Sequence, residues 1–284
     1  MARISCTGYR PLATSAESRC RSKALLLSIE SEQEERVTQM TAKRIALVTG
    51  ASSGIGRAIA KALLDDECCV ILAGRNEEAL REVAATDHAA NVHVLPLDVT
   101  NFSAVDTLFD HMPAAFREID LLVNNAGHDI GGRTRFDQGP AEDWTNVIET
   151  NVSGLIRVTR AVVPGMIARG RGDVINVGSV NALRVIPDMA AYSASKAAVH
   201  AFSDGLRADL ANTPIRVIEI LPGLTRTDIV VRRFRGDRAR AEAYYESFGM
   251  ALQPDDIAAG VLFAINQPPQ VTIAQMVIMP TNRY

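Results

Sequence analysis

The 284-residue chain predicts an α/β protein: a single-domain, doubly wound parallel sheet of about seven strands with helices on both faces. Short apolar runs alternate with longer helical segments from Lys43 to the end of the chain. A glycine-rich turn separates the first apolar run from the first helical segment. No internal repeat or low-complexity linker divides residues 43–284, so we expect one domain there.

Seven short runs rich in Val, Ile and Leu have the length and composition of strands that are buried on both faces. The first run ends directly at the glycine-rich turn, as a buried parallel strand does before a tight connection. The predicted strands cover residues 45–48, 70–73, 92–97, 121–123, 173–177, 215–220 and 276–279.

Most of the segments between these strands have helical patterns. Residues 55–65 repeat apolar side chains at the helical period, with Ile59 and Leu63 on one side. The two longest helical segments are residues 142–169 and 190–211, both rich in Ala and Val. Because parallel strands need crossover connections, this alternation predicts helices over both faces of the sheet.

The composition excludes several classes of protein. Apolar residues make up 47% of the chain and charged residues 22%, which is ordinary for a globular protein with a large core. The net charge of -3 and the lack of a basic stripe indicate no nucleic-acid partner. The longest apolar runs fall short of the roughly 18 residues that a membrane helix needs. The four cysteines lack metal-ligand spacing, which favours a reduced, cytoplasmic protein without a metal site.

The first 39 residues differ from the rest, and the predicted domain covers residues 40–284. Three interpretations of residues 1–39 stay open. We favour a misassigned gene start, with translation beginning at Met40, over a disordered extension. An organelle transit peptide is the third, because residues 2–16 carry Arg and Ser without acids, although Glu17 weakens it.

Tyr192 and Lys196 form the pattern that is most informative about chemistry. They lie four residues apart in a predicted helix, so the phenol and the ammonium share one face. A phenol is a weak base near neutral pH because its reference pKa is about 10. A neighbouring ammonium favours the phenolate and brings proton transfer closer to working pH. Ser179, with twelve residues between it and Tyr192, adds a hydroxyl donor.

The glycine-rich turn from Thr49 to Gly56 follows a strand and opens a helix, which is the context of a dinucleotide site. We expect the glycines to permit the tight turn, the approach of a pyrophosphate and the packing of the helix on the sheet. The unpaired N–H groups at the helix N-terminus would bind phosphate. The predicted cofactor contacts in this turn are Gly50, Ser52, Ser53, Gly54, Ile55 and Gly56.

The ends of the next two strands bear on the choice of nicotinamide cofactor. An NAD site carries an Asp or Glu at the end of the second strand, whereas this chain has Arg75. The guanidinium fork suits a 2′-phosphate, so we expect NADP; alternatively, Arg75 is the first solvated residue of a helix. Asp98, followed by Val99, would accept from the adenine amino group or cap the next helix.

Six motifs occur in one order along the chain: Thr49-Gly-x3-Gly54-x-Gly56, Asn124-Asn125-Ala126-Gly127, Asn151, Ser179, Tyr192-x3-Lys196 and Pro222-Gly223. In this order they resemble a short-chain dehydrogenase/reductase with a Rossmann fold. The resemblance spans nearly the whole of residues 43–284, so a chance match is very improbable.

The resemblance implies a role for each catalytic candidate. Tyr192 would be the general base in alcohol oxidation, Lys196 would lower its pKa and bind the nicotinamide ribose, and Ser179 would hydrogen-bond the substrate oxygen. Asn151 would hold a water that links Lys196 to solvent. Direct hydride transfer needs no metal. The further cofactor contacts that the resemblance implies are Asn125, Ala126, Gly127, Tyr192, Lys196, Pro222, Gly223, Leu224 and Thr227.

Segments 159–166 and 233–237 give a narrower likeness, to the NADP-dependent 3-hydroxy acid dehydrogenases that act on L-serine, L-allo-threonine or 3-hydroxypropionate. The likeness implies a short 3-hydroxy acid as the small-molecule substrate, and a homo-tetramer. A carboxylate substrate needs a cation near the reacting carbon. Arg184, between Ser179 and Tyr192, and Arg233 are the candidates.

Two alternatives stay open. Apolar residues in segments 183–190 and 224–250 would favour a carbonyl or 3-oxoacyl reductase of bulkier ketones. A non-catalytic NADP-binding regulator is a different class, against which the intact Ser179, Tyr192, Lys196 and Asn151 argue. His128 follows the Asn-Asn-Ala-Gly turn and either faces substrate or, as we expect, the surface.

Overall fold

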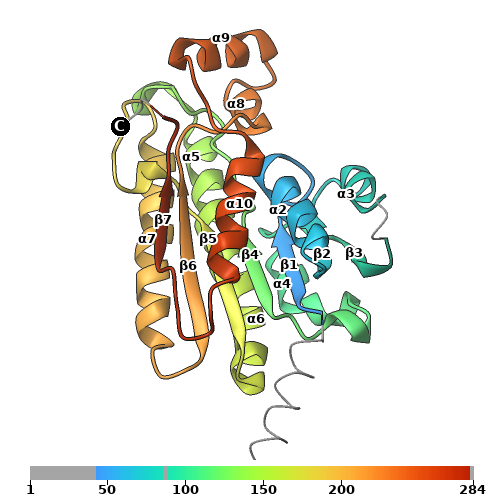
Figure 1. The fold of residues 1–284 in the computed structure, drawn as a ribbon. Helices are drawn as coiled ribbons and strands as arrows, with labels where there is room; N and C mark the ends of the chain where they lie inside the picture. The colour runs from blue at the N-terminus through green and yellow to red at the C-terminus, as the bar shows by residue number, and fades with distance from the viewer. Residues whose placement is uncertain (1–42, 86–88, 282–284) are drawn as a thin grey trace, which may run out of the picture. The chain divides into compact units, whose positions relative to one another are not determined.

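The computed structural model describes residues 43–85 and 89–281, so the interpretations of residues 1–39 lie outside the described part. Its centre is a parallel sheet of seven strands in the order β3-β2-β1-β4-β5-β6-β7, which confirms the predicted sheet (Figure 1). The strands are β1 (Ile45–Thr49), β2 (Cys69–Gly74), β3 (Val92–Pro96), β4 (Leu121–Asn124), β5 (Gly172–Val177), β6 (Ile215–Pro222) and β7 (Gln275–Ile278).

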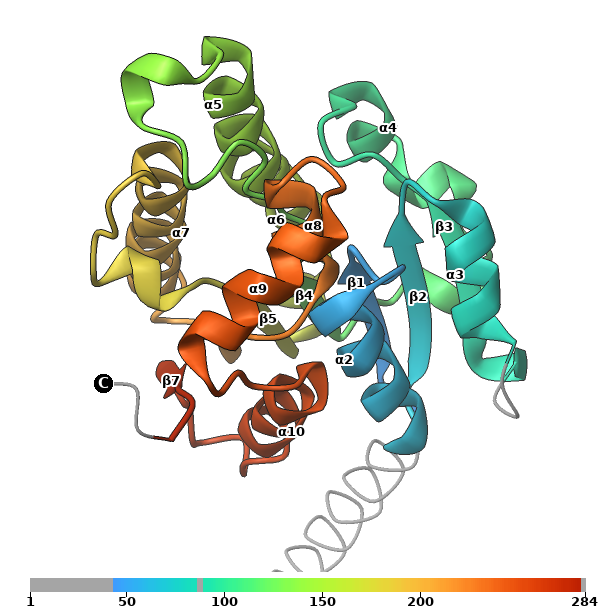
Figure 2. The same ribbon diagram turned by 90° about the horizontal axis from the view of Figure 1, so that it is seen from above.

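Helices cover both faces of the sheet (Figure 2). One face packs against α2 (Gly54–Asp65), α3 (Glu77–Ala84) and α10 (Pro254–Ile265). The other packs against α4 (Phe102–Asp106), α6 (Leu155–Arg169) and α7 (Ala190–Asp209). Neighbouring residues of each strand enter opposite cores because side chains alternate along a strand. No helix among the described residues has both the length and the apolar character needed to cross a bilayer.

The predicted helix 142–169 is a continuous helical run with an irregular middle. It consists of α5 (Ala141–Ile148), a π-helical turn (Glu149–Gly154) and α6. Gly154 lets this turn lie against the neighbouring loop, because a Cβ there would be 2.7 Å from Cγ2 of Val99. Such π turns inside α-helices are rare and frequent at functional sites.

Two short helices, α8 (Asp228–Arg233) and α9 (Arg238–Phe248), lie on the side of the sheet where the strands end (Figure 1). They interrupt the connection from β6 to α10. Thr227 caps α8, and Asp237 caps α9, each by accepting a hydrogen bond from a backbone N–H of the first turn. The segment therefore forms an ordered cover over the carboxyl ends of the strands.

Arg216 of β6 fastens α10 to the sheet. Its Nε and Nη2 bind the two carboxylate oxygens of Asp173 in β5, both at 2.6 Å. The same guanidinium donates to the carbonyls of Ile265, Gln267 and Val271 at 2.9–3.2 Å, so it satisfies the carbonyl of the last residue of α10 and two carbonyls of the loop that follows.

We expect Arg216→Met to lower the free energy of unfolding by about 3 kcal/mol, because it leaves a buried carboxylate and several carbonyls unpaired. Urea unfolding followed by circular dichroism measures the change. Arg81→Met is the control: it removes an exposed pair with Glu77 within α3, and such helical pairs contribute about 0.5 kcal/mol or less. Equal losses in the two variants would contradict this account of Arg216.

Candidate active site

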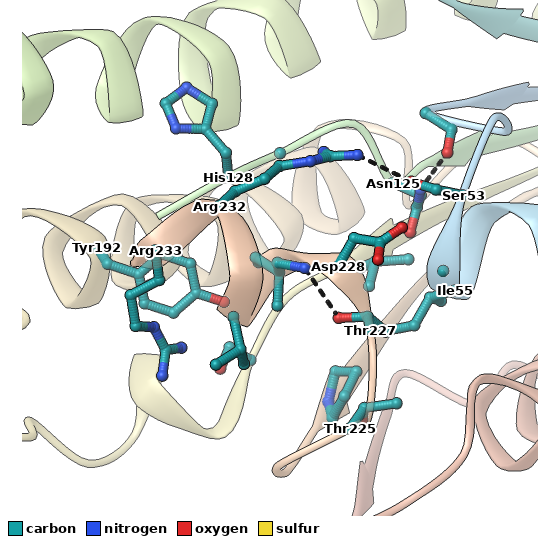
Figure 3. Close-up of a pocket in the computed structure, with 18 of the residues that line it drawn as sticks. Ser53, Ile55, Asn125, His128, Tyr192, Thr225, Thr227, Asp228, Arg232 and Arg233 are labelled. Atoms are coloured by element: carbon teal, nitrogen blue, oxygen red, sulfur yellow. Dashed lines mark hydrogen bonds between the residues drawn. The ribbon is translucent and has the colours of Figure 1, made fainter. Parts of the chain in front are cut away.

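The cavity of interest lies where the strand order reverses. The connection from β1 leads to β2 on one side of the sheet, and β4 adjoins β1 on the other. In open α/β sheets ligands bind at this point, outside the carboxyl ends of the strands. Here the structure has a cavity of about 660 Å³, bounded by the glycine turn, the strand ends, α8 and α9 (Figure 3).

The glycine turn is held to the loop after β4 by side-chain hydrogen bonds. Oγ1 of Thr49 accepts from the backbone N–H groups of Asn125 and Ala126, both at 3.0 Å. Nδ2 of Asn125 donates to the carbonyls of Thr49 and Gly50 at 3.0 and 3.3 Å. Gly50 has a φ of +67°, and a Cβ there would lie 2.8 Å from that same Nδ2. Only glycine satisfies both restraints.

Gly56 has the packing role that the sequence suggested for these glycines, without facing the cavity. A Cβ at Gly56 would lie 2.3 Å from the carbonyl oxygen of Gly50, so this glycine allows α2 to pack on the turn. Gly56 does not line the cavity. Every other predicted cofactor contact does: Gly50, Ser52, Ser53, Gly54, Ile55, Arg75, Asp98, Val99, Asn125, Ala126, Gly127, Tyr192, Lys196, Pro222, Gly223, Leu224 and Thr227.

Arg75 and Asp98 meet at one end of this cavity. Nη1 of Arg75 lies 4.0 Å from Oδ2 of Asp98, and 68% of the arginine side chain is exposed. Arg75 is not the first residue of a helix, and Asp98 does not cap one, so both of these alternatives from the sequence are wrong. Asn76 caps α3, so Arg75 precedes that helix; Asn101 caps α4, while Asp98 accepts hydrogen bonds from Thr100. Both side chains therefore remain at the cavity wall.

Tyr192 and Lys196 lie on one face of α7, next to Ser179 at the end of β5, and all three line the cavity. Nζ of Lys196 donates to the carbonyl of Val177 at 2.8 Å and lies 5.9 Å from the centroid of the Tyr192 ring. Burial, together with the negative charge of Asp129, raises the pKa of Tyr192 to about 12. The hydrogen bond with Ser179 acts in the opposite direction and lowers this pKa. Burial lowers the pKa of Lys196 to about 8, although the negative charges of Glu219 and Asp129 favour a higher value.

Asn151 lies behind these residues and does not line the cavity. It is buried in the π-helical turn, where its side chain binds both backbone groups of His128: Oδ1 accepts from the N–H at 2.9 Å, and Nδ2 donates to the carbonyl at 3.0 Å. Nδ2 also donates to Oγ of Ser195 at 3.0 Å, in the helix that carries Tyr192 and Lys196. In this structure Asn151 thus ties the loop after β4 to α7.

The two arginines predicted to bind a substrate carboxylate lie in different environments. Arg233 is buried, lines the cavity and is electrostatically coupled to Tyr192. Arg184 is exposed and lies outside the cavity lining, so its position does not suit that role. Nε and Nη2 of Arg233 donate to Oδ2 of buried Asp129, at 2.8 and 2.6 Å. Burial raises the pKa of this aspartate, and Arg233 opposes the rise.

Several cavity residues were not expected from the sequence. His128 is half-buried in the wall instead of lying at the surface, and its Nε2 lies 3.2 Å from Oγ1 of Thr150. Burial lowers the pKa of His128, and the positive charges of Arg75 and Arg232 lower it further. Its place directly after the Asn-Asn-Ala-Gly turn was the available signal. No group of three or more His, Cys, Asp or Glu side chains suited to a metal occurs among the described residues.

Two further arginines reach the cavity, Arg133 from the loop between β4 and α5 and Arg232 from α8. Nη2 of Arg133 donates to the hydroxyl of Tyr244 at 3.0 Å, across 111 positions of the sequence. Nη2 of Arg232 donates to Oγ of Ser53 at 3.0 Å, which joins α8 to the glycine turn (Figure 3). Spacing along the chain gives no indication of either contact.

The parallel sheet, the glycine turn at its switch point and the adjoining Ser–Tyr–Lys group are those of a dinucleotide-dependent oxidoreductase. Residues 44–238 match the short chain dehydrogenase family, and the chain belongs to this family.

Characterised relatives cover most of the chain. Sulfoacetaldehyde reductase 2 of Chromohalobacter salexigens is 39% identical over 241 residues, which is 84% of this chain and 95% of the relative. The NADP-dependent 3-hydroxy acid dehydrogenase YdfG of Salmonella typhi is 40% identical over 240 residues, covering 84% and 96%. The closed form of a serine dehydrogenase complexed with NADP+ has a TM-score of 0.81 at 37% identity, covering 84% and 96%.

Proposed function

We propose that the protein is an NADP-dependent oxidoreductase that interconverts a short 3-hydroxy acid and its 3-oxo form. The observation that carries the proposal is the buried Arg233, which lines the cavity and is coupled to Tyr192 (Figure 3). A cation there suits a small substrate whose anionic group lies close to the reacting carbon. The names of the relatives support it, because they include a 3-hydroxy acid dehydrogenase and a sulfoacetaldehyde reductase.

The residues at the other end of the cavity fit NADP. The N-terminus of α2 and the glycine turn present N–H groups for phosphate, and a side chain at Gly50 would fill the space beside Asn125. Arg75 stands at the end of β2 without a neighbouring acid in its strand, as a 2′-phosphate requires. When bound, the nicotinamide ring supplies the hydride acceptor or donor.

The protein's own residues would move the proton. In oxidation Tyr192 takes the proton of the substrate hydroxyl, and in reduction it returns that proton to the carbonyl oxygen. Ser179 donates a hydrogen bond to the same oxygen and stabilises the charge that develops there. Lys196 favours the phenolate by its charge. Asn151 would hold the loop and helix that fix these groups, and the relay water that the family resemblance implies would lie next to it.

A reductase of bulkier ketones is the second candidate. Apolar side chains from the segments singled out in the sequence line part of the cavity, which would suit a larger substituent. They are Ile186, Met189, Leu224, Ile229, Val230, Tyr244, Phe248 and Met250. A polyketide ketoreductase with NADPH is a structural relative at 31% identity and a TM-score of 0.73.

The assembly that we propose is a homo-tetramer. Support comes from apolar side chains on the outer surface of the helices: Ile156 and Ile167 of α6 are 39% and 42% exposed, and Ile148 of α5 is 37% exposed. Ile156 and Ile167 are three turns apart and so share one face. Burying such a face against a second copy would remove it from water.

We expect Tyr192→Phe to bind NADPH as the wild type does and to lose turnover by at least ~10³-fold, because the proton acceptor is gone while the ring is retained. NADPH binding is measured by fluorescence titration, and turnover by initial rates. The regulator hypothesis would regain ground if Tyr192→Phe kept the cellular role of the protein. A residual rate of a tenth or more of the wild type would disprove the role of Tyr192.

Arg75→Asp should shift cofactor preference from NADP towards NAD by on the order of 10²-fold in kcat/KM, because a carboxylate repels the 2′-phosphate and accepts from ribose hydroxyls. Initial rates with each cofactor measure the ratio. Arg81→Asp, on the exposed side of α3, controls for the general effect of a charge change nearby. An unchanged ratio in Arg75→Asp would show that another residue discriminates.

The proposed substrate class is tested by initial rates with L-serine, L-allo-threonine, 3-hydroxypropionate and 3-hydroxyisobutyrate, in the presence of NADP. We expect turnover of at least one, and a rise of about tenfold or more in its KM in Arg233→Gln. Arg184→Gln is the matched control and should leave the KM unchanged. If none of the acids reacts while NADPH binds and neutral ketones are reduced, the second candidate is favoured.

A further inference from the structure

We propose that Asp129 sets the charge specificity of the substrate pocket by competing with the substrate's anionic group for Arg233. This inference rests on the proposed function, in which Arg233 binds that group. Asp129 lies in the loop between β4 and α5, and the sequence around it does not mark it as a residue that determines the substrate.

Asp129 occupies the part of Arg233 that a carboxylate would use. Both Nε and Nη2 donate to Oδ2, at 2.8 and 2.6 Å, and the two side chains are 0% and 7% exposed. A free carboxylate binds a guanidinium best through two parallel hydrogen bonds. In the described part of the chain neither Nη1 of Arg233 nor Oδ1 of Asp129 has a hydrogen-bond partner. Asp129 thus occupies the side-on fork formed by Nε and Nη2, and a substrate anion is left the edge of the guanidinium that carries Nη1.

The pair also removes most of the attraction that the pocket would have for an anion. Asp129 and Arg233 carry opposite charges of equal size, so together they add no net charge beside Tyr192. Taking an anion out of water is costly unless an opposite charge compensates. A guanidinium that is already neutralised compensates less than a free one. Asp129 thus weakens the binding of acids relative to neutral molecules of the same shape.

A purely structural ion pair is the competing explanation. The loop that carries Asp129 packs on Arg233, since a Cβ at Gly132 would lie 3.4 Å from Cγ of the arginine. On that explanation the pair only holds the loop on α8, and its loss would affect all substrates alike. The comparison of an acid with its amide separates the two explanations, because the amide has the same size without the charge.

The test uses 3-hydroxybutyrate and 3-hydroxybutyramide with the full-length protein and NADP. Asp129→Asn keeps the shape and an acceptor oxygen but removes the charge. We expect it to raise the ratio of kcat/KM for the acid to that for the amide by tenfold or more, mainly through a lower KM for the acid. Asp137→Asn, an exposed residue paired with Arg135 outside the cavity lining, is the matched control and should leave the ratio unchanged.

Arg233→Gln completes a double-mutant cycle. If Asp129 acts through Arg233, Asp129→Asn will not change the acid-to-amide ratio in the Arg233→Gln background. An unchanged or lower ratio in the single Asp129→Asn variant would overturn the proposal, as would an equal rise in both backgrounds. Asp129→Ser offers a second neutral replacement if the asparagine variant does not fold.

Failure of the proposed function is recognised separately. If the wild type oxidises neither compound, calorimetry with the NADP complex replaces turnover, with propionate and propionamide as the probes. Tighter binding of propionate, with unchanged binding of propionamide, in Asp129→Asn supports the role of Asp129 even then. Equal affinities of the variant and the wild type for propionate would disprove it.

Discussion

The hydrogen bonds between Thr49 and Asn125 are the constraint on which the site depends. They join the end of β1 to the loop after β4, where the order of the strands reverses. The glycine turn cannot move away from that loop without losing them, and Gly50 and Gly56 remove the side chains that would force it away. The glycine turn and the N-terminus of α2 are therefore held in place beside the cavity, and a helix N-terminus of this kind is suited to a phosphate.

Much of this arrangement could be predicted from the sequence, because local patterns determine it. Buried parallel strands are continuous apolar runs, and all seven were found within about two residues of their ends. Tyr192 and Lys196 share a helix face at their spacing, so their proximity to each other required no knowledge of the fold. The glycine turn could likewise be predicted from its local pattern, although Gly56 serves only helix packing and does not line the cavity.

The rest could not be predicted, because it depends on contacts between distant segments. Arg184 and Arg233 both belong to segments near the reacting group, and only the packing of α8 shows that Arg233 turns inward. The π-helical turn arises where Asn151 binds the backbone of His128 and where Gly154 meets Val99, and neither contact has a local signature. The pairing of Arg133 with Tyr244 is of the same kind.

Burial acts on Tyr192 and Lys196 in the same sense, since it opposes the charged form of each. It raises the pKa of the phenol and lowers that of the ammonium, so the free protein keeps both groups close to neutral at alkaline pH. The charge of Glu219 in β6 favours the charged state of Lys196; this glutamate is wholly buried and accepts a hydrogen bond from Gln275 beside His200. A carboxylate in the sheet thus helps to maintain the positive charge of Lys196. Lys196 therefore depends on the interior of the sheet for its charge as well as for its position, because its Nζ also donates to the carbonyl of Val177 in β5.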